Sequence, residues 1–194
     1  MVEAVGSDVT TLKVGDRVFG NTGGGAYAEY ATCAEGRAQK IPDRAKLDQA
    51  IAYPVNMRTA WFCVYPWGKI KEGENVLVHT AAGGVGRMIV QVLKRRFKNV
   101  NVIGLASSDE KLEFAKAHGA ELTLNYARED LKEGLKRLTG GKGVDIIFDP
   151  VGGSYAEAAL RAIAWEGRFL VIGFAAGDIP KMPLNLALLK GCDI

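Results

Sequence analysis

Hydrophobic positions from residue 75 onward alternate between short continuous apolar runs and longer stretches with helical spacing. The apolar runs, rich in Val, Ile and Leu, predict strands at residues 75–79, 100–106, 121–125, 144–148 and 168–173. The stretches between them repeat apolar residues every three or four positions and predict helices at residues 84–97, 109–118, 128–139 and 153–164. Apolar strands that alternate with amphipathic helices indicate a sheet covered on both faces. We therefore expect an α/β fold built on a doubly wound parallel sheet.

The residues before this region follow a different pattern. Short apolar runs separated by glycines predict strands at residues 1–5, 16–20 and 26–33, with a loop, NTGGG, at 21–25. Such a segment is too short to bury both faces of a sheet of its own. Residues 47–65 then predict a connecting helix that Pro54 interrupts. We expect two parts: a partial β domain with its connector at 1–55, and the α/β domain at 56–194.

Composition and charge exclude several classes of protein. Hydrophobic residues make up 48% of the chain and charged residues 24%, which is typical of a soluble folded protein and not of a disordered one. The 25 basic and 22 acidic residues are dispersed, so we expect no nucleic-acid partner. No apolar run approaches the roughly 18 residues of a membrane span. Three widely spaced cysteines and an N-terminus without a targeting segment favour a cytoplasmic location.

A glycine-rich loop, TAAGGVG, follows the first strand of the α/β region and opens its first helix. Ala81, Gly83 and Gly86 occupy the three fixed positions of the G-x-G-x-x-G pattern, with alanine in the first. At the start of a helix, free N–H groups and the helix dipole favour a pyrophosphate. A tight turn that binds nothing is the alternative. The loops DPVGG (149–153) and GFAAG (173–177) end later strands, so we expect them at the same edge of the sheet.

The end of the second strand of the α/β region indicates which dinucleotide is bound. Ala106 lies about 20 residues after Gly86, where NAD-specific chains carry an acid that binds the adenine ribose. Ser107 and Ser108 follow it instead, with Lys111 one turn later. The helix dipole disfavours a cation near a helix N-terminus unless an anion lies nearby. A 2′-phosphate would be that anion, so the segment favours NADPH over NADH.

Two observations qualify this interpretation. Ser107 and Glu110 match the S-x-x-E capping box, which would explain the serine by helix capping alone, although it leaves Lys111 unexplained. Asp109 and Glu110 also add negative charge that opposes a 2′-phosphate.

The sequence does not predict a metal site or a nucleophilic triad. The cysteines and the two histidines do not cluster at the spacing of zinc ligands. His79 ends a buried strand, and His118, which precedes Gly119, is expected to cap a helix. Neither histidine lies beside a nucleophile elbow.

Seven segments in order along the chain resemble the zinc-free quinone oxidoreductase branch of the medium-chain dehydrogenase/reductase superfamily, which includes zeta-crystallin. They are VGDRVFG with GAYAEY, GENVLVHTAAGGVG, SSDEKLEFAKAHGAE, NYARED, LTGGKGVDIIFDPVGG and EGRFLVIGFAAG. The resemblance implies a Rossmann-like domain with five of its six strands, preceded by a β stub of a GroES-like catalytic domain. We therefore expect the chain to be an internal piece of a longer protein.

The resemblance also implies roles for individual residues. Lys111 and Tyr126, assisted by Ser107 or Ser108, would contact the 2′-phosphate of NADPH, and Thr59 matches a position near the nicotinamide. The residues expected to bind the cofactor are Thr59, Ala82, Gly83, Gly84, Val85, Ser107, Ser108, Lys111, Tyr126, Val151, Gly153, Ile172, Gly173 and Phe174. No catalytic residue is assigned, because the family's catalytic side chains lie largely in the N-terminal domain.

By this resemblance we expect an NADPH-dependent, zinc-independent oxidoreductase that transfers a hydride to a small molecule, either a quinone or an activated alkene. The full-length protein is expected to form a homo-oligomer. Two alternatives stay open: a non-catalytic NADPH-binding or interaction module, and an alkenal or enoyl reductase.

Overall fold

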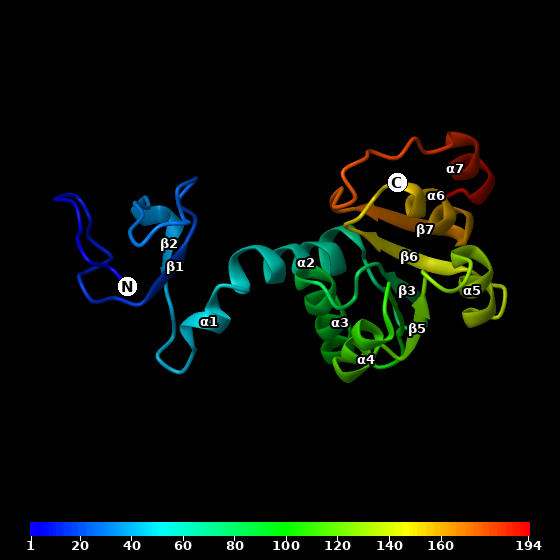
Figure 1. Ribbon diagram of the computed structural model, residues 1–194, viewed down its shortest axis with the longest axis horizontal. Helices are drawn as coiled ribbons and strands as arrows, with labels where there is room; N and C mark the ends of the chain where they lie inside the picture. Colours follow the sequence, from blue (N-terminus) through cyan, green and yellow to red (C-terminus); the bar gives the residue numbers. More distant parts are fainter. The chain divides into compact units, whose positions relative to one another are not determined.

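A computed structural model describes residues 1–194, which divide into two compact units, Met1–Arg58 and Thr59–Ile194. Figure 1 follows the chain from its N-terminus to its C-terminus.

The second unit is built on a parallel sheet of five strands in the order β5-β4-β3-β6-β7. Its strands are β3 (Asn75–Val78), β4 (Asn101–Ala106), β5 (Leu122–Asn125), β6 (Val144–Asp149) and β7 (Ile163–Val171). The strand order reverses at β3, since the chain adds β4 and β5 on one side and then β6 and β7 on the other. The predicted doubly wound parallel sheet is therefore confirmed.

Helices cover both faces of this sheet. They are α3 (Gly84–Arg96), α4 (Asp109–Ala117), α5 (Leu131–Leu138), α6 (Ser154–Arg161) and α7 (Leu184–Lys190). Figure 1 shows α3 and α4, in green, on one side of the strands, and α6 and α7, in yellow to red, on the other. None of the helices is both long and apolar enough to cross a membrane.

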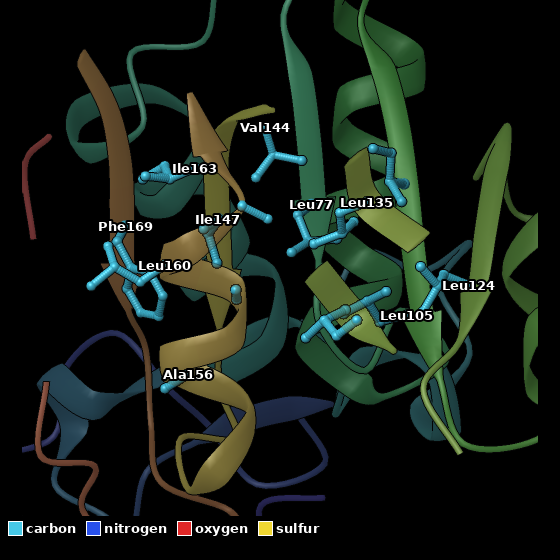
Figure 2. Close-up of a cluster of buried hydrophobic side chains, with 14 of the residues drawn as sticks. Leu77, Leu105, Leu124, Leu135, Val144, Ile147, Ala156, Leu160, Ile163 and Phe169 are labelled. Atoms are coloured by element: carbon cyan, nitrogen blue, oxygen red, sulfur yellow. The ribbon is translucent and has the colours of Figure 1, made fainter. Parts of the chain in front are cut away.

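The main hydrophobic core lies between the sheet and helices α5 and α6 (Figure 2). Leu77 at its centre is in register with Ile103 on one neighbouring strand and Ile147 on the other. Because side chains alternate along a strand, these three residues share one face of the sheet. Leu135 and Leu160 belong to the same cluster and cover that face from the two helices. The apolar runs of the strands are thus buried on both sides, as their composition predicts.

The first unit contains less regular structure than the sequence predicts. Strand β1 (Val18–Gly20) pairs antiparallel with β2 (Ala38–Lys40), and the 3-10 helix η1 (Glu35–Arg37) precedes β2. The strands predicted at 1–5 and 26–33 are wrong, and β2 is absent from the prediction. A strand needs a neighbouring strand with which it forms a ladder of hydrogen bonds. Residues 1–5 form only isolated backbone hydrogen bonds with Gly15 and Asp16. Residues 26–33 have no such ladder, and their tyrosines are exposed.

The helical connector is interrupted as the sequence predicts. It consists of α1 (Leu47–Ala50), the π-helical turn η2 (Tyr53–Met57), α2 (Arg58–Phe62) and the π-helical turn η3 (Cys63–Trp67). Pro54 lies at the start of η2, and Pro66 lies inside η3. Proline removes a backbone donor, so each lies where the regular helical pattern is broken.

The C-terminal part differs from the prediction at two places. Helix α6 ends at Arg161 and β7 begins at Ile163, so residues expected to be helical belong to the strand. The pairing register shifts from Val144 with Ile163 to Ile146 with Arg168, so residues 164–167 form an irregularity in β7. The spacing of apolar residues in the sequence does not predict this irregularity. The sequence pattern does not predict helix α7.

Replacing Leu77 by alanine tests the packing of the core around the row of Leu77, Ile103 and Ile147. Leu77 is fully buried, so we expect Leu77→Ala to lower the free energy of unfolding by about 3 kcal/mol in urea denaturation. Leu188→Ala is the matched control, because Leu188 is 81% exposed and its truncation should change stability by less than about 0.5 kcal/mol. Equal effects of the two substitutions would contradict this description of the core.

Candidate functional site

A cavity of about 630 Å³ opens at the carboxyl ends of β3 and β4. The loops that follow β3, β4 and β5, the end of β4 and the start of α4 form its walls, through Thr80, Ala82, Gly83, Ala106, Ser107, Glu110, Lys111, Phe114 and Tyr126. Five of these residues are among the expected cofactor contacts: Ala82, Gly83, Ser107, Lys111 and Tyr126. Ligands of open α/β sheets bind at this edge, beside the point where the strand order reverses.

The glycine-rich segment at residues 80–86, which we call the phosphate loop after the ligand expected there, joins β3 to α3, forms one wall and needs its glycines for close packing. Gly83 is the N-cap of α3 and has no side chain to bond the first N–H groups of the helix. Gly84 and Val85, two further expected contacts, are the first residues of α3. A Cβ on Gly86 would lie 2.3 Å from the carbonyl oxygen of Thr80, so the helix can approach the loop only with glycine there. The start of α3 therefore keeps uncapped donors beside the cavity.

The loop between β4 and α4 corrects the prediction of helix capping. Ser108, and not Ser107, is the N-cap of α4, and its hydroxyl accepts a hydrogen bond from the Lys111 N–H at 3.4 Å. The proposed Ser107–Glu110 capping box is therefore wrong by one residue, because β4 ends at Ala106 and the chain makes a two-residue bend before the helix. Ser107 instead lines the cavity.

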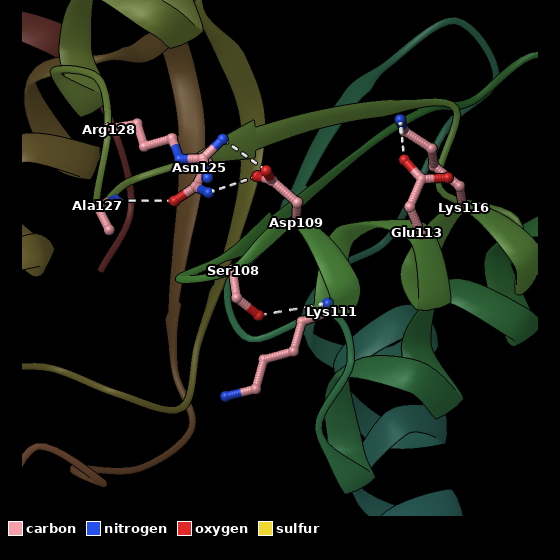
Figure 3. A network of polar contacts seen from close by, with 8 residues as sticks. All are labelled: Ser108, Asp109, Lys111, Glu113, Lys116, Asn125, Ala127 and Arg128. Carbon is pink, nitrogen blue, oxygen red and sulfur yellow. Dashed lines mark hydrogen bonds and ion pairs between the residues drawn. The ribbon is translucent and has the colours of Figure 1, made fainter.

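The charged residues at the start of α4 differ in their partners. The Asp109 carboxylate accepts hydrogen bonds from Asn125 Nδ2 at 2.8 Å and from Arg128 at 2.5 Å (Figure 3). Figure 3 shows the Lys111 side chain pointing away from this network. None of the ion pairs in the chain includes Lys111 or Glu110. The cavity wall thus carries one unpaired cation and one unpaired carboxylate, while the charge of Asp109 is compensated.

The remaining expected contacts lie mostly in a second structure at the same edge, which we call the double loop: residues 149–153, which start at the last residue of β6, and residues 172–178 after β7. Backbone hydrogen bonds join its halves, from Ala175 N to Pro150 O at 3.1 Å and from Ala176 N to Val151 O at 3.0 Å. It contains the expected contacts Val151, Gly153, Ile172, Gly173 and Phe174. None of them lines the cavity, and neither does Thr59, which lies on α2.

Sequence reasoning missed a buried pair between the phosphate loop and the double loop. His79 Nδ1 lies 3.1 Å from Asp149 Oδ1, and both residues are almost fully buried. Burial opposes ionisation of Asp149, but hydrogen bonds from His79 and from the N–H groups of Gly152 and Val151 outweigh it and hold the pKa of the carboxyl below its usual value. The available signal was a polar residue at the end of each of two apolar strands, NVLVH and VDIIFD.

Other reactive groups do not form a second site. The chain contains no group of three or more His, Cys, Asp or Glu residues that could hold a metal ion. Burial raises the pKa of the Cys63 thiol to about 11, so this cysteine is protonated at neutral pH and a poor nucleophile. His118 caps α4 as expected, with its Nδ1 2.7 Å from the Phe114 carbonyl oxygen.

Comparison with known proteins identifies the family. The family described as zinc-binding dehydrogenase matches residues 84–194, more than half of the chain. A quinone oxidoreductase-like protein 2 from Bos taurus is 41% identical over 190 residues, which cover 98% of this chain and 54% of the bovine protein. The chain belongs to the quinone oxidoreductase branch of the medium-chain dehydrogenase/reductase superfamily.

Solved structures of other quinone oxidoreductases and their relatives have the same fold. The Escherichia coli quinone oxidoreductase in complex with NADPH is 30% identical with a TM-score of 0.83, and the match covers 98% of this chain and 59% of that one. A mycobacterial protein in complex with NADPH is 32% identical with a TM-score of 0.87, covering 99% of this chain and 60% of that one. The chain spans about half the length of the curated relatives it matches. Although the matching family is described as zinc-binding, residues 1–194 do not offer a zinc ligand set.

Adding a methyl group at Gly86 tests the close approach of the phosphate loop. Glycine to alanine inside a helix ordinarily stabilises a protein by up to about 1 kcal/mol, but here the added Cβ collides with Thr80. We expect Gly86→Ala to lower the free energy of unfolding by about 2 kcal/mol in urea denaturation. Gly36→Ala, in a 3-10 helix with no atom within 4 Å of the added group, is the control and should have little effect. A stabilised Gly86→Ala protein would refute the close contact.

Proposed function

We propose that this member of the quinone oxidoreductase branch is an NADPH-dependent oxidoreductase that transfers a hydride to a quinone or an activated alkene without zinc. The observation that carries the proposal is the unpaired Lys111 in a cavity whose strand end carries Ala106 where NAD-specific chains carry an acid. The NADPH complexes of the Escherichia coli and mycobacterial relatives support the same cofactor.

The residues of the cavity and its rim fit the phosphates of this cofactor. The start of α3 offers uncapped backbone donors to the pyrophosphate, with Gly83 allowing close approach. Lys111, Ser107 and Tyr126 offer a cation and two hydroxyl groups to the 2′-phosphate.

Selectivity for the 2′-phosphate depends on which acids face it. Asp109 is paired with Arg128 and Asn125, so its charge contributes little repulsion. Glu110 lines the cavity unpaired, and its carboxylate opposes an anion there. We propose that Lys111 outweighs Glu110, because a direct charge-assisted bond to the phosphate is stronger than repulsion screened by solvent. The result is a preference for NADPH over NADH.

NADPH, when bound, supplies the hydride that reduces the substrate. The chain's own residues bind and orient it: the cavity holds the adenosine half, and the double loop, through Val151, Gly153, Ile172, Gly173 and Phe174, lies against the nicotinamide half. No residue of the chain is assigned as the proton donor, so water or a tyrosine outside these residues supplies the proton that accompanies the hydride. Residues 1–194 contain no set of zinc ligands, so we propose that the hydride transfer uses no metal ion bound by these residues.

Titration with both cofactors tests the role of Lys111. We expect Lys111→Ala to weaken NADPH binding by about 10- to 100-fold, the loss of a charge-assisted hydrogen bond, and to leave NADH binding unchanged. Enhancement of reduced-nicotinamide fluorescence measures both affinities. Lys116→Ala is the matched control on the same helix, since Lys116 pairs with Glu113 at 2.7 Å and does not line the cavity. Equal NADPH affinities of wild type and Lys111→Ala would remove Lys111 from the site.

A turnover assay distinguishes the proposed activity from its alternatives. The chain, NADPH and p-benzoquinone are mixed, and loss of the reduced-nicotinamide absorbance is compared with the reaction without protein. We expect faster loss with the protein, at a rate that EDTA does not change. Turnover of methyl vinyl ketone but not of the quinone would restrict the substrate to activated alkenes, as in an alkenal or enoyl reductase. NADPH binding without turnover of either substrate would favour the non-catalytic module.

A further inference from the structure

The buried pair of His79 and Asp149 joins the two halves of the proposed cofactor site. His79 directly follows β3 and Asp149 ends β6, and these strands are neighbours at the point where the strand order reverses. The atoms Nδ1 and Oδ1 are 3.1 Å apart, and the side chains are 3% and 4% exposed. Because an ionised carboxylate only accepts hydrogen bonds, we assign the proton of this bond to His79 Nδ1. Below the protein surface, the pair therefore links the ends of β3 and β6, from which the phosphate loop and the double loop start.

Asp149 fixes the double loop through the same oxygen that meets His79. Asp149 Oδ1 accepts hydrogen bonds from Val151 N at 2.9 Å and from Gly152 N at 3.0 Å. Gly152 and Gly153 have φ values of +67° and +63°, a left-handed conformation that favours glycine. The backbone bonds between the two halves then carry this arrangement to residues 172–178. One carboxylate thus anchors the first half of the double loop, and backbone hydrogen bonds join the second half to it.

His79 fixes the other side of the link. It directly precedes Thr80, the first residue of the phosphate loop, whose hydroxyl donates a hydrogen bond to the His79 carbonyl oxygen at 2.7 Å. The imidazole ring meets Tyr126 and Tyr155 almost at right angles, at centroid distances of 5.5 and 5.7 Å. The hydrogen bond between Nδ1 and Asp149 and the contacts with the two tyrosine rings together fix the orientation of the imidazole.

His79 also carries a cost that packing alone does not explain. Its Nε2 is buried and has no hydrogen-bond partner in the structure. A buried polar atom without a partner destabilises the folded state, and a leucine of similar volume would avoid that cost. A histidine is useful here for its Nδ1 donor, which reaches Asp149.

We infer that His79 and Asp149 form a positioning pair that fixes the double loop beside the phosphate loop and so determines how tightly the nicotinamide half of NADPH is held. Neither residue is placed in contact with the cofactor. The inference rests on the proposed function, because it assigns the double loop to the nicotinamide half. It separates two tasks along the cavity and its rim: Lys111 holds the 2′-phosphate, and the pair holds the double loop.

Two probes and three variants test this division. Adenosine 2′,5′-bisphosphate carries the adenine and the 2′-phosphate without the nicotinamide, so it reports on the cavity alone, whereas NADPH reports on both halves. We expect His79→Leu, which loses the donor but keeps the volume against which Tyr126 packs, to weaken NADPH binding about tenfold and the bisphosphate affinity by less than about threefold. His79→Asn should restore NADPH affinity to within about threefold of wild type, because the asparagine amide can donate to Asp149. Calorimetric titration measures all affinities.

Asp149→Asn keeps the inference testable if His79→Leu does not fold. It removes the charge that the three donors share, and we expect the same selective loss of NADPH affinity. Unchanged NADPH affinity in His79→Leu or Asp149→Asn, parallel losses for both probes, or no recovery in His79→Asn would overturn the positioning role. A wild-type chain that binds neither probe would instead overturn the proposed function.

Discussion

The pairing of β3 with β4 on one side and β6 on the other is the constraint on which the rest of the structure depends. Parallel strands send their carboxyl ends to one edge, and the reversal of strand order at β3 opens a crevice there. The phosphate loop, the loop after β4 and the double loop all meet at this edge. The apolar row through Leu77 lies on the face of the sheet that α5 and α6 cover. The strand register that fills this core therefore also fixes where the loops at the carboxyl ends of the strands lie.

Charge compensation gives the crevice its chemical character. The first turn of α4 carries Asp109, Glu110 and Lys111, whose net charge alone would not attract a phosphate. Arg128 and Asn125 engage Asp109 from the segment after β5, and Lys111 stays unpaired at the cavity wall. A sequence pattern shows three neighbouring charges, whereas the fold determines which of them has a partner. The proposed preference for NADPH follows from that difference.

The sequence predicts the α/β domain well because its strands are continuous apolar runs and its helices have regular apolar spacing. The glycine-rich motif and the serine and lysine residues after the second strand locate Ala82, Gly83, Ser107 and Lys111, and the family resemblance adds Tyr126; the structure brings these residues together in one cavity. Sequence-based prediction fails where strand formation depends on a pairing partner, as at residues 1–5 and 26–33. It also fails at the start of α4, where a shift of one residue decides which serine caps the helix. His79 and Asp149 lie 70 positions apart, and only the adjacency of β3 and β6 makes them a pair.

An NMR titration of the isotopically labelled chain with NADPH tests the central claim, that this crevice holds the cofactor, most directly. The account predicts that amide resonances change at residues 82–86, 107–111 and 126 and in the double loop at 151–153 and 172–174. NADH at the same concentration should perturb residues 107–111 least, because it lacks the 2′-phosphate. Saturation with NADPH that leaves these amides unchanged, or that shifts amides only elsewhere in the chain, would contradict the account.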